Sequence, residues 1–459
     1  FCTLLKYFSS TYQFMSDSMR MDAEYVEDSP LAVLARLRDQ FADQPIHRDA
    51  SGNPTAFFDV TDFTTPIRAE VIEDMATAIV QTVPGLSDID LVVSIADRSS
   101  GALSHAVALR LKVPYSLANW YPDGSPGEIE VERSKGFSGH GVVYLNGIKK
   151  GKRVLLVMDV MKTGSTSLKL IQAVQSVGAT VVAAAYGCEV LEFGAREKFP
   201  EVPIYSMVTV KMQGEMTKEG SSLPPTRHPA PHVESRIAQI KKMPKQELEA
   251  KMERVTKTFV GVPIQRNPLL SYPYSFFPLT DFVPALDPEI VEDMADLCVY
   301  YGDFSNCDVL VSEADRGGGP LVQACALRTD LPYVLANWAP SGDGVGAASS
   351  AQVGFSGEGR IVVNGIKAET RCLFVDDMLS SGGTAEGVLK ALVQLGGVPV
   401  EGVFISEKLY PPKQAGDLPF RKGKARLNEI FPHFKVTTVA QFIAEGDMTK
   451  APSNRVGDY

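Results

Sequence analysis

The sequence lacks the surplus of basic residues that nucleic-acid-binding proteins carry. It has 45 lysine and arginine residues against 55 acidic residues, a formal net charge of −10 at pH 7, which argues against a nucleic-acid-binding surface. It also lacks an apolar run of the roughly 18 residues that a membrane-spanning helix needs. Its six cysteines are irregularly spaced, several of them in apolar segments, which favours reduced core thiols over a disulfide framework. We therefore expect a cytoplasmic protein that binds neither nucleic acid nor membrane.

The first residues leave a second compartment open. The chain begins at Phe1 and has no acidic residue before Asp17, and an acid-poor start is compatible with a mitochondrial transit segment. Lys6 is the sole basic residue before Arg20, which favours upstream sequence ahead of Met15 instead. A mitochondrial location is therefore the alternative to a cytoplasmic one.

Motifs of several common sites are missing as well. The chain contains no GxxxxGK[ST] segment, which excludes a P-loop NTPase. His228 and His232 lie four residues apart in a proline-rich stretch with no third ligand nearby, so a solvated pair is favoured over a zinc site.

Two stretches of the chain follow one pattern. Val154–Thr166 (VLLVMDVMKTGST) and Cys372–Thr384 (CLFVDDMLSSGGT) each run from an apolar segment through acidic residues into a Gly/Ser/Thr loop. The apolar segments predict buried strands, and the residues after each loop predict an amphipathic helix. Because α/β folds bind ligands at the carboxyl ends of their strands, we expect these acids to face a ligand.

The polar loops are suited to an anion. Glycines allow a tight turn, and the unpaired N–H groups that begin the next helix attract phosphate together with the helix dipole. Strand-end carboxylates can accept hydrogen bonds from hydroxyls or hold a metal. A single copy would be better explained by an ordinary strand-to-helix turn with a Ser or Thr N-cap. Two copies favour a site for a phosphorylated sugar.

The likeness between the two halves of the chain extends beyond these stretches. Adding 218 to the positions of Arg153, Asp159 and Thr166 gives Arg371, Asp377 and Thr384. At the same offset, residues 115–122 match residues 333–340, and residues 136–141 match residues 354–359. Since stacked repeats have periods of only about 20 to 50 residues, this spacing indicates a tandem duplication of a whole domain.

The duplication predicts the domain organisation. We expect an N-terminal extension over residues 1–27, a first domain over 28–212, a linker rich in proline, glycine and serine over 213–243, and a second domain over 244–459. In the first domain, strands are expected at residues 90–94, 113–118, 142–145, 153–157 and 180–185, with helices at 101–111 and 165–177. This alternation predicts a mostly parallel α/β sheet, with a long loop between Trp120 and Gly141 of the kind that forms lids.

The chain resembles the type I phosphoribosyltransferases. Their signature is an apolar strand, two acids, three variable residues and Thr-Gly-Gly-Thr, and residues 376–384 (DDMLSSGGT) fit it with Ser381 in place of the first threonine. Residues 189–198 and 202–206 resemble the C-terminal segment of adenine phosphoribosyltransferases. The resemblance covers most of each repeat. It implies two tandem type I phosphoribosyltransferase-like domains of the α/β class, each with a mostly parallel central sheet flanked by helices and with a long lid excursion.

The resemblance also implies a reaction and a set of roles. The reaction is transfer of ribose 5-phosphate from phosphoribosyl pyrophosphate (PRPP) to a purine base, foremost adenine, with Mg²⁺ and release of pyrophosphate. Asp376 and Asp377 would hold the ribose hydroxyls and the metal. The 5-phosphate would bind the loop residues Ser380, Ser381, Gly382, Gly383 and Thr384. In the first repeat the corresponding loop residues are Thr163, Gly164, Ser165 and Thr166, and the corresponding acid is Asp159.

The pyrophosphate loops implied by the resemblance follow two other strands, at Asp97, Arg98 and Ser99 and at Asp315, Arg316 and Gly317. An arginine there can pair with a leaving pyrophosphate; a surface ion pair is the alternative for Arg98 and Arg316. Glu132 of the lid is the candidate general acid, with Asp377 and Asp159 as the other catalytic candidates, and a solvated acidic loop is the alternative for Glu132.

The two copies depart from the family pattern in opposite ways. The first has Met158 where the first acid should stand, under a lid that contains Glu128, Glu130 and Glu132. The second keeps both acids, but its lid, residues 341–357, contains Asp343 as its single acid. The segment that contacts adenine in the family has Phe-Arg before Asp, whereas residues 57–59 are Phe-Phe-Asp and residues 276–278 are Phe-Phe-Pro. The missing arginine leaves the choice of base open.

Two functions remain open. The chain is either an active purine phosphoribosyltransferase, whose repeats form an intramolecular pseudo-dimer, or a degenerate relative. The degenerate relative would bind PRPP or a nucleotide as a regulator, or serve as a structural subunit of a larger assembly. The intact acid pair favours the enzyme, while the incompleteness of each copy supports the alternative.

Overall fold

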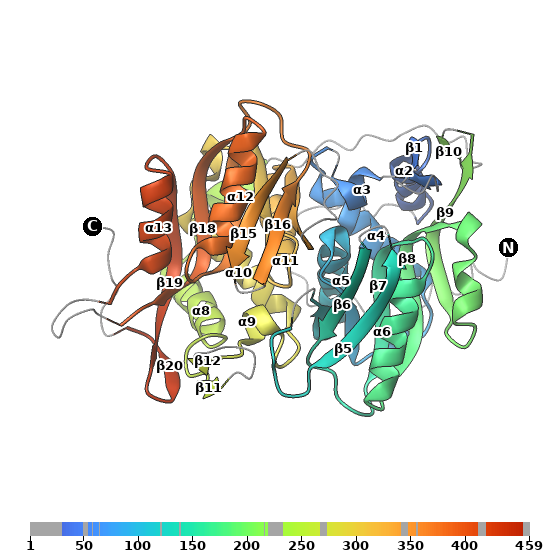
Figure 1. Cartoon of the computed structure of the whole chain (residues 1–459), viewed down its shortest axis with the longest axis horizontal. Helices are drawn as coiled ribbons and strands as arrows, with labels where there is room; N and C mark the ends of the chain where they lie inside the picture. The colour runs from blue at the N-terminus through green and yellow to red at the C-terminus, as the bar shows by residue number, and fades with distance from the viewer. Residues whose placement is uncertain are drawn as a thin grey trace.

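The structure, a computed structural model, describes residues 30–48, 54–56, 58–63, 65–119, 122–136, 139–214, 216–218, 233–266, 273–340, 348–354, 357–411 and 419–452. We call residues 30–218 the N-terminal half and residues 233–452 the C-terminal half. Figure 1 shows one large sheet in each half, lying side by side, with helices packed on the sheets. None of the described helices has both the length and the apolar character needed to cross a membrane.

The N-terminal half is built on a six-stranded sheet in the order β10-β9-β8-β7-β3-β4. Neighbouring strands are parallel except β10, which runs antiparallel to β9. Every residue of β3 is buried, as expected for a parallel strand covered by helices on both faces. The strands are β3 (Leu91–Ile95), β4 (Tyr115–Ala118), β7 (Arg153–Met161), β8 (Thr180–Val190), β9 (Ile204–Gln213) and β10 (Met216–Lys218), and the main helices are α2 (Pro30–Phe41), α4 (Ala69–Thr82), α5 (Arg98–Leu111) and α6 (Ser165–Ser176).

The C-terminal half has an eight-stranded sheet in the order β15-β16-β14-β13-β17-β18-β19-β20. Its last six strands in that order correspond one by one to the six of the N-terminal sheet, and β14, β13, β17, β18 and β19 are parallel. The strands are β13 (Val309–Glu313), β14 (Tyr333–Pro340), β15 (Ala348–Gly354), β16 (Gly357–Val363), β17 (Arg371–Leu379), β18 (Val398–Leu409), β19 (Lys435–Glu445) and β20 (Met448–Lys450). The helices are α7 (Val233–Lys241), α8 (Lys245–Thr256), α10 (Pro288–Tyr301), α11 (Gly318–Thr329), α12 (Gly383–Gln394) and α13 (Lys422–Ile430).

Shorter elements connect these. They are β1 (Ile46–Arg48), β2 (Pro54–Ala56), α3 (Asp59–Asp62), η1 (Leu86–Asp88), β5 (Ile129–Gly136), β6 (Gly139–Leu145), η2 (Leu191–Phe193), η3 (Ala195–Lys198), β11 (Gln265–Arg266), β12 (Pro273–Tyr274), α9 (Pro278–Asp281) and η4 (Phe304–Asn306).

The mostly parallel α/β sheet expected from the sequence is confirmed, and each expected strand and helix of the N-terminal half is present. The expected loop between Trp120 and Gly141 is largely a hairpin instead, because β5 pairs antiparallel with β6. Within the expected linker, Met216–Lys218 pairs with β9 as β10, and Val233–Lys241 forms α7, whose Arg236 donates to Leu327 O at 2.9 Å. Residues 219–232 of that linker and the expected extension, residues 1–27, lie outside the described residues.

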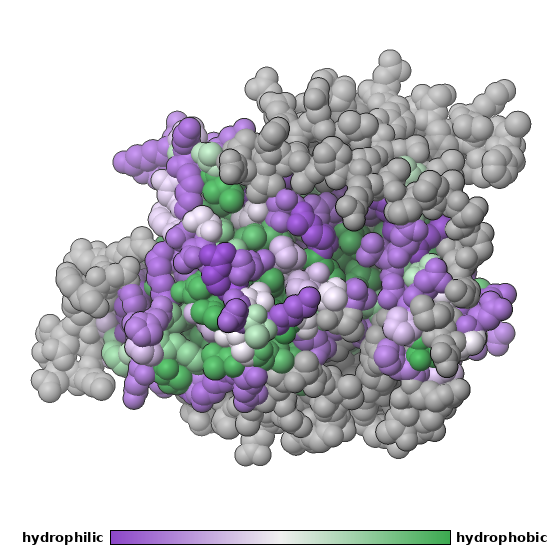
Figure 2. Space-filling view, turned by 90° about the horizontal axis from the view of Figure 1, so that it is seen from above, coloured by the Kyte–Doolittle hydropathy of each residue, from purple (hydrophilic) through white to green (hydrophobic). Residues whose placement is uncertain are grey.

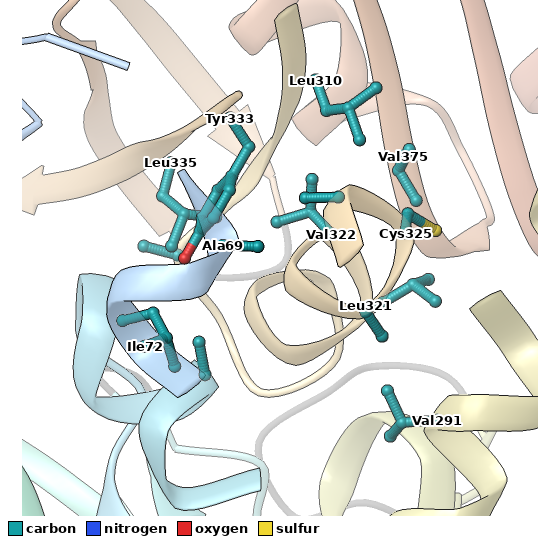
Figure 3. Close-up of a cluster of buried hydrophobic side chains, with 14 of the residues drawn as sticks. Ala69, Ile72, Val291, Leu310, Leu321, Val322, Cys325, Tyr333, Leu335 and Val375 are labelled. Carbon is teal, nitrogen blue, oxygen red and sulfur yellow. The ribbon is translucent and has the colours of Figure 1, made fainter. Parts of the chain in front are cut away.

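The two halves share one apolar core. Helix α11 is buried on nearly every side, which is the pattern of a helix enclosed within a protein rather than one with a solvent-facing surface. In Figure 3, Ala69 and Ile72 of α4 lie beside the ring of Tyr333 and near Val322 of α11. Outside this core, Figure 2 shows hydrophilic side chains bordering several separate apolar areas on the described part of the face seen from above.

Contacts between the halves occur in matching pairs. Tyr115 and Leu286 exchange two backbone hydrogen bonds of 3.0 Å, and so do Tyr333 and Ile67. Tyr333 is 218 positions after Tyr115, and Leu286 is 219 positions after Ile67. Each half therefore presents the same two backbone segments to the other, with the roles exchanged.

Matching pairs of side chains and close approaches accompany these bridges. Asn146 donates to Asp281 O at 3.0 Å, and Asn364 donates to Asp62 O at 3.2 Å. The glycine after each asparagine has a positive φ and leaves no room for a side chain: a Cβ at Gly147 would lie 2.8 Å from Phe282 O, and the equivalent position at residue 365 is as tightly packed against the N-terminal half. The approach of the two backbones thus depends on glycine at these turns.

Candidate functional site

A cluster of buried carboxylates lies at the carboxyl edge of the C-terminal sheet. Asp376 and Asp377 are 6% and 5% exposed at the end of β17. Glu313 ends the neighbouring parallel strand β13, and Asp315 follows it in the loop that leads to α11. Strands β13 and β17 are adjacent in the sheet, so their carboxyl ends bring all four acids together.

These carboxylates raise one another's pKa. Burial is the main cause for Asp377, and the neighbouring Asp376, Asp315 and Asp281 add to it, so its pKa is well above the ordinary value. Burial, then Asp315 and Glu313, raise the pKa of Asp376 in the same way. Burial also raises the pKa of Asp315, to about 6, against the hydrogen bond of 2.7 Å from Gly318 N–H. A cation or a set of hydroxyl donors placed here would relieve this repulsion.

The donors present fit magnesium held jointly with a substrate. Among the described residues, no group of three or more His, Cys, Asp or Glu side chains is arranged to hold a metal by itself. Mg²⁺ commonly binds through one or two carboxylates together with waters and substrate phosphates. Asp376 and Asp377 offer hard oxygen atoms at the end of one strand, which suits that mode of binding.

Next to the acids lies the loop that leads into α12. Gly382 adopts the left-handed conformation at φ 78° and is the N-cap of α12. The start of α12 at Gly383 carries the positive end of the helix dipole, which favours an anion at this place. A Cβ at position 423 of α13 would lie 2.7 Å from Ser380 O, so α13 supports this loop from behind.

Three further residues at this loop escaped the sequence-based prediction. Tyr410 Oη forms a hydrogen bond of 3.1 Å with Ser380 Oγ. Lys408 Nζ lies 5.5 Å and Lys422 Nζ 5.2 Å from the centre of the Tyr410 ring. Burial and then Lys422 lower the pKa of Lys408. Two ammonium groups close together beside an anion-binding loop favour a ligand that carries negative charge. A lysine near the carboxyl end of β18, two residues after Ser406, was the available signal.

The N-terminal half has a different arrangement at the equivalent place. Met158, the counterpart of Asp376, is buried, and Ser167 Oγ lies 3.4 Å from its Sδ. Asp159 Oδ1 accepts a hydrogen bond of 2.9 Å from Ser100 Oγ in the first turn of α5. The counterpart of Ser100 is Gly318, which has no hydroxyl. In the N-terminal half, the carboxylate of Asp159 is therefore already hydrogen-bonded to Ser100 at the start of α5.

Burial, then Asp97, raise the pKa of Asp159 to about 7 in spite of this hydrogen bond. The loop before α6 resembles that of the other half, since Gly164 is the N-cap at φ 70°. Thr163 Oγ1 lies 3.2 Å from Ser165 Oγ, which also accepts a hydrogen bond of 3.2 Å from Lys198 Nζ. Thr166 follows in the first turn of α6. These residues keep the polar loop but pair it with a single acid.

The position of Arg316 corrects one expectation. Its guanidinium, expected to face pyrophosphate or solvent, is 1% exposed and forms an ion pair with Asp123 of the N-terminal half. Its Nε donates to Leu117 O and its Nη2 to Tyr144 O, both at 2.8 Å. All three nitrogens of the guanidinium are occupied by acceptors from the other half, so Arg316 links the two halves.

The other residues predicted for the pyrophosphate loops and the lid are described only in part by the structure. Asp97 is the N-cap of α5, which begins at Arg98, and Ser99 Oγ donates to Val60 O. Gly317 packs directly against the Asp377 carboxylate. The side chains of Glu132 and Arg98 lie outside the described part of the structure, although the backbone of Glu132 pairs with Val142 in the β5–β6 hairpin.

The phenylalanines of the Phe-Phe-Asp and Phe-Phe-Pro segments belong to the core where the structure describes them. Phe58 and Phe277 are buried, with ring centres 5.1 Å from Phe41 and 5.4 Å from Phe442 respectively. Phe57 lies outside the described residues. Stacking of a purine on Phe58 or Phe277 is therefore excluded by their burial.

Comparison with known proteins identifies the family. Residues 60–220 match the model of the phosphoribosyl transferase domain. The chain is 30% identical over 184 residues to the hypoxanthine/guanine phosphoribosyltransferase of Methanosarcina acetivorans, a match that spans 40% of this chain and 95% of that protein. This chain belongs to the phosphoribosyltransferase family. The corresponding protein of Methanohalophilus mahii, also a hypoxanthine/guanine phosphoribosyltransferase, is 33% identical over 145 residues, 32% of this chain and 74% of the relative.

Solved phosphoribosyltransferases were also found. The adenine phosphoribosyltransferase of Thermoanaerobacter pseudethanolicus covers 38% of this chain and 99% of its own, with a TM-score of 0.32 and 20% identity. That of Trypanosoma brucei, in complex with AMP, pyrophosphate and ribose 5-phosphate, covers 40% of this chain and 81% of its own, with a TM-score of 0.33 and 20% identity. The match of residues 60–220 to the family model and the relative with 30% identity confirm the resemblance to the phosphoribosyltransferases at the level of the family.

Proposed function

We propose that this phosphoribosyltransferase transfers ribose 5-phosphate from PRPP to a purine base and that its C-terminal half carries out the reaction. The observation that supports this most is the buried pair Asp376 and Asp377 beside the Gly382 N-cap of α12. In the reaction, a ring nitrogen of the base forms a bond to C1 of the ribose, the bond from C1 to pyrophosphate breaks, and the base loses its N–H proton.

Each part of the C-terminal site has a task in this proposal. Asp376 and Asp377 accept hydrogen bonds from the ribose hydroxyls, and the N–H groups at the start of α12 hold the 5-phosphate with Ser380, Ser381 and Thr384. Asp315 and Gly317 line the pyrophosphate side. Mg²⁺, when bound at Asp376 and Asp377 with the substrate oxygens, supplies positive charge that stabilises the leaving pyrophosphate.

The N-terminal half is assigned a weaker role. With Met158 in place of the first acid, it lacks a charged acceptor whose hydrogen bond contributes about 1.5 to 3 kcal/mol. Ser100 also occupies the remaining acid, Asp159. Glu132 remains the proposed general acid of this half. These features support the alternative role, in which the N-terminal half binds PRPP or a nucleotide without turnover and acts as a structural or regulatory unit.

We further propose that the halves are two phosphoribosyltransferase-like domains arranged as an intramolecular pseudo-dimer. The matched strand order of the two sheets supports this. The paired bridges of Tyr115 with Leu286 and of Tyr333 with Ile67 support it independently. Assembly into a larger particle remains a proposal that rests on the family resemblance.

For the base, the candidates are adenine, from the motifs of the sequence, and hypoxanthine or guanine, from the names of the relatives with at least 30% identity. The absence of arginine before Asp59 counts against adenine, although residues 189–198 and 202–206 resemble adenine phosphoribosyltransferases. We therefore propose a 6-oxopurine as the preferred base.

The test uses purified full-length protein with PRPP, Mg²⁺ and radiolabelled adenine, hypoxanthine, guanine and xanthine. We expect nucleotide from hypoxanthine or guanine at a higher kcat/KM than from adenine. The absence of any nucleotide would refute the enzyme, and a clear preference for adenine would refute the proposed base. Asp377→Asn should abolish turnover, while the matched change Asp159→Asn should be milder; equal losses would refute the assignment to the C-terminal half.

PRPP binding separates the enzyme from the alternative role. Millimolar PRPP with Mg²⁺ should raise the melting temperature, because a ligand that binds the native state stabilises it. A shift without turnover would support the non-catalytic role. No shift and no turnover would exclude both.

A further inference from the structure

The loop after β13 is held by the N-terminal half. Arg316 lies in this loop between Asp315 and Gly317, and its guanidinium forms a buried ion pair with Asp123, which is 2% exposed. The neighbours of Arg316 on both sides contact the acid cluster: Asp315 influences the pKa of Asp377, and the backbone of Gly317 packs against the Asp377 carboxylate. Asp123 is thus separated from the acid pair by a single side chain and a short segment of backbone.

Asp123 is itself held rigidly by its own half. Glu128 accepts hydrogen bonds from Asp123 N–H at 2.8 Å and from Gly124 N–H at 3.0 Å. Asn146 Nδ2 donates to Asp123 Oδ2 at 2.7 Å, and Ser125 Oγ donates to Asn146 Oδ1 at 2.8 Å. The carboxylate that pairs with Arg316 is therefore also held by hydrogen bonds within its own half, and such support fixes the geometry of a binding group.

Asn146 also joins this group to the C-terminal half. Its Nδ2 donates to Asp281 O at 3.0 Å, and Arg316 Nη1 lies 3.4 Å from the same oxygen. Burial, then Asp123, raise the pKa of Asp281 to about 7, and Asp281 in turn contributes to the raised pKa of Asp377. Asp123 therefore acts on Asp281, and Asp281 acts on Asp377.

The ion pair between Arg316 and Asp123 is not repeated at the equivalent positions with the two halves exchanged. The position 218 residues after Asp123 is Ser341, which has no carboxylate, while Arg98 is the counterpart of Arg316. The matched backbone bridges are symmetric, but this ion pair has no acidic counterpart at the equivalent position. The N-terminal half thus supplies a carboxylate to the loop after β13. The C-terminal half has a serine at the equivalent position and cannot supply a carboxylate from there.

We propose that Asp123 is a positioning residue for the C-terminal site: acting through Arg316, it sets the pyrophosphate loop against Asp377, so the N-terminal half controls PRPP binding in the other half. This proposal rests on the proposed function. It gives the half with the incomplete site a task, because losing the carboxylate would leave a buried guanidinium without its charge partner and let the loop move.

The experiment compares Asp123→Asn with Asp330→Asn in the full-length protein. Asp330 forms an ion pair with Arg68, which also joins the two halves but is exposed and lies at the far end of α11. Since small displacements of a binding loop have large effects, Asp123→Asn should raise the KM for PRPP about tenfold or more and leave the KM for the purine within about twofold. Asp330→Asn should leave both values unchanged.

Several results would overturn the proposal. They are an unchanged KM for PRPP in Asp123→Asn, an equal rise in Asp330→Asn, or an equal rise in the KM of both substrates, which would indicate general loosening. Should Asp123→Asn fail to fold, Asp123→Glu keeps the charge on a longer side chain and should raise the KM for PRPP by a smaller factor; no rise would count against the proposal.

The outcome is separable from that of the proposed function. Wild-type protein that forms no nucleotide from any base refutes the reaction, whereas an active wild type with an unaffected Asp123→Asn variant refutes the positioning role alone. The rise in melting temperature produced by PRPP and Mg²⁺ provides the same comparison without turnover: it should shrink in Asp123→Asn and persist in Asp330→Asn.

Discussion

The substitution Gly317→Ala tests the geometry of the acid pair directly. Gly317 has φ −88° and ψ −48°, so its backbone accepts alanine without strain. A Cβ at this position would lie 3.0 Å from Asp377 Cβ and would overlap the carboxylate beyond it. Because non-bonded atoms settle about 3.5 to 4 Å apart, the carboxylate of Asp377 has to move.

The size of the effect follows from that displacement. A carboxylate that moves by about 1 Å is misplaced for the ribose hydroxyls, and a misplacement of about 1 Å costs roughly a hundredfold in rate. We therefore expect kcat/KM for PRPP to fall about a hundredfold, equivalent to about 2.7 kcal/mol of transition-state stabilisation. Thermal unfolding should be little changed, since the atom that gives way is the end of a side chain.

The matched control is Gly319→Ala, two residues further on. There the new Cβ would lie 3.9 Å from Leu335 Cδ1, an ordinary contact, and alanine favours the helix that contains it. Steady-state kinetics of both variants, with the PRPP-dependent melting shift as a second measurement, give the comparison. If Gly317→Ala stays within about threefold of Gly319→Ala, the placement of Asp377 against this loop is wrong.

Two predictions concern stability. The folded-state pKa of Asp159, about 7, lies above its ordinary value of 3.8. Between these two pH values the folded protein therefore binds more protons than the unfolded chain. Asp159 consequently lowers the free energy of unfolding as the pH rises through that window. From pH 5 to pH 8 the free energy of unfolding of Asp159→Asn, measured relative to wild type in urea, should therefore increase by about 2 to 3 kcal/mol; a constant difference would contradict the raised pKa. At the junction of the halves, Gly147→Ala adds a Cβ 2.8 Å from Phe282 O at φ 75°, whereas Gly151→Ala has a similar φ of 80° and no described atom within 4 Å. Gly147→Ala should cost about 1 to 3 kcal/mol more than Gly151→Ala in the same unfolding measurement, and equal costs would show that the halves can move apart there.

The strand, loop and helix around each acid could be predicted because the signals are local. An apolar run such as that of Val154–Val157 predicts a buried strand, and glycine at position 164 or 382 predicts the turn that begins the helix. The parallel sheet followed from the alternation of these elements. The strand at residues 142–145 was predicted, but its partner β5 was missed, because the alternation Ile129-Glu130-Val131-Glu132 is short and is followed by the polar residues 133–136.

The partners of Arg316 could not be predicted from such local signals. Asp123 is 193 residues away in the sequence, and no periodicity connects the two. Ser100 and Gly318 looked like equivalent loop residues, yet the hydroxyl of Ser100 bonds to Asp159 while Gly318 has no side chain to do so. The difference between the two sites therefore depends on contacts between segments distant in sequence, which a pattern within one segment does not encode.

The burial of α11 on nearly every side has a consequence for synthesis of the chain. The surfaces of α4 and α5 that α11 covers are complete once residue 218 has been made, but α11 ends at Thr329. At about 5 to 20 residues per second, the ribosome takes roughly 5 to 20 s to supply it. During that interval the N-terminal half on the ribosome exposes the apolar surface that α11 later covers. We expect chaperones to bind this surface until the C-terminal half has been synthesised.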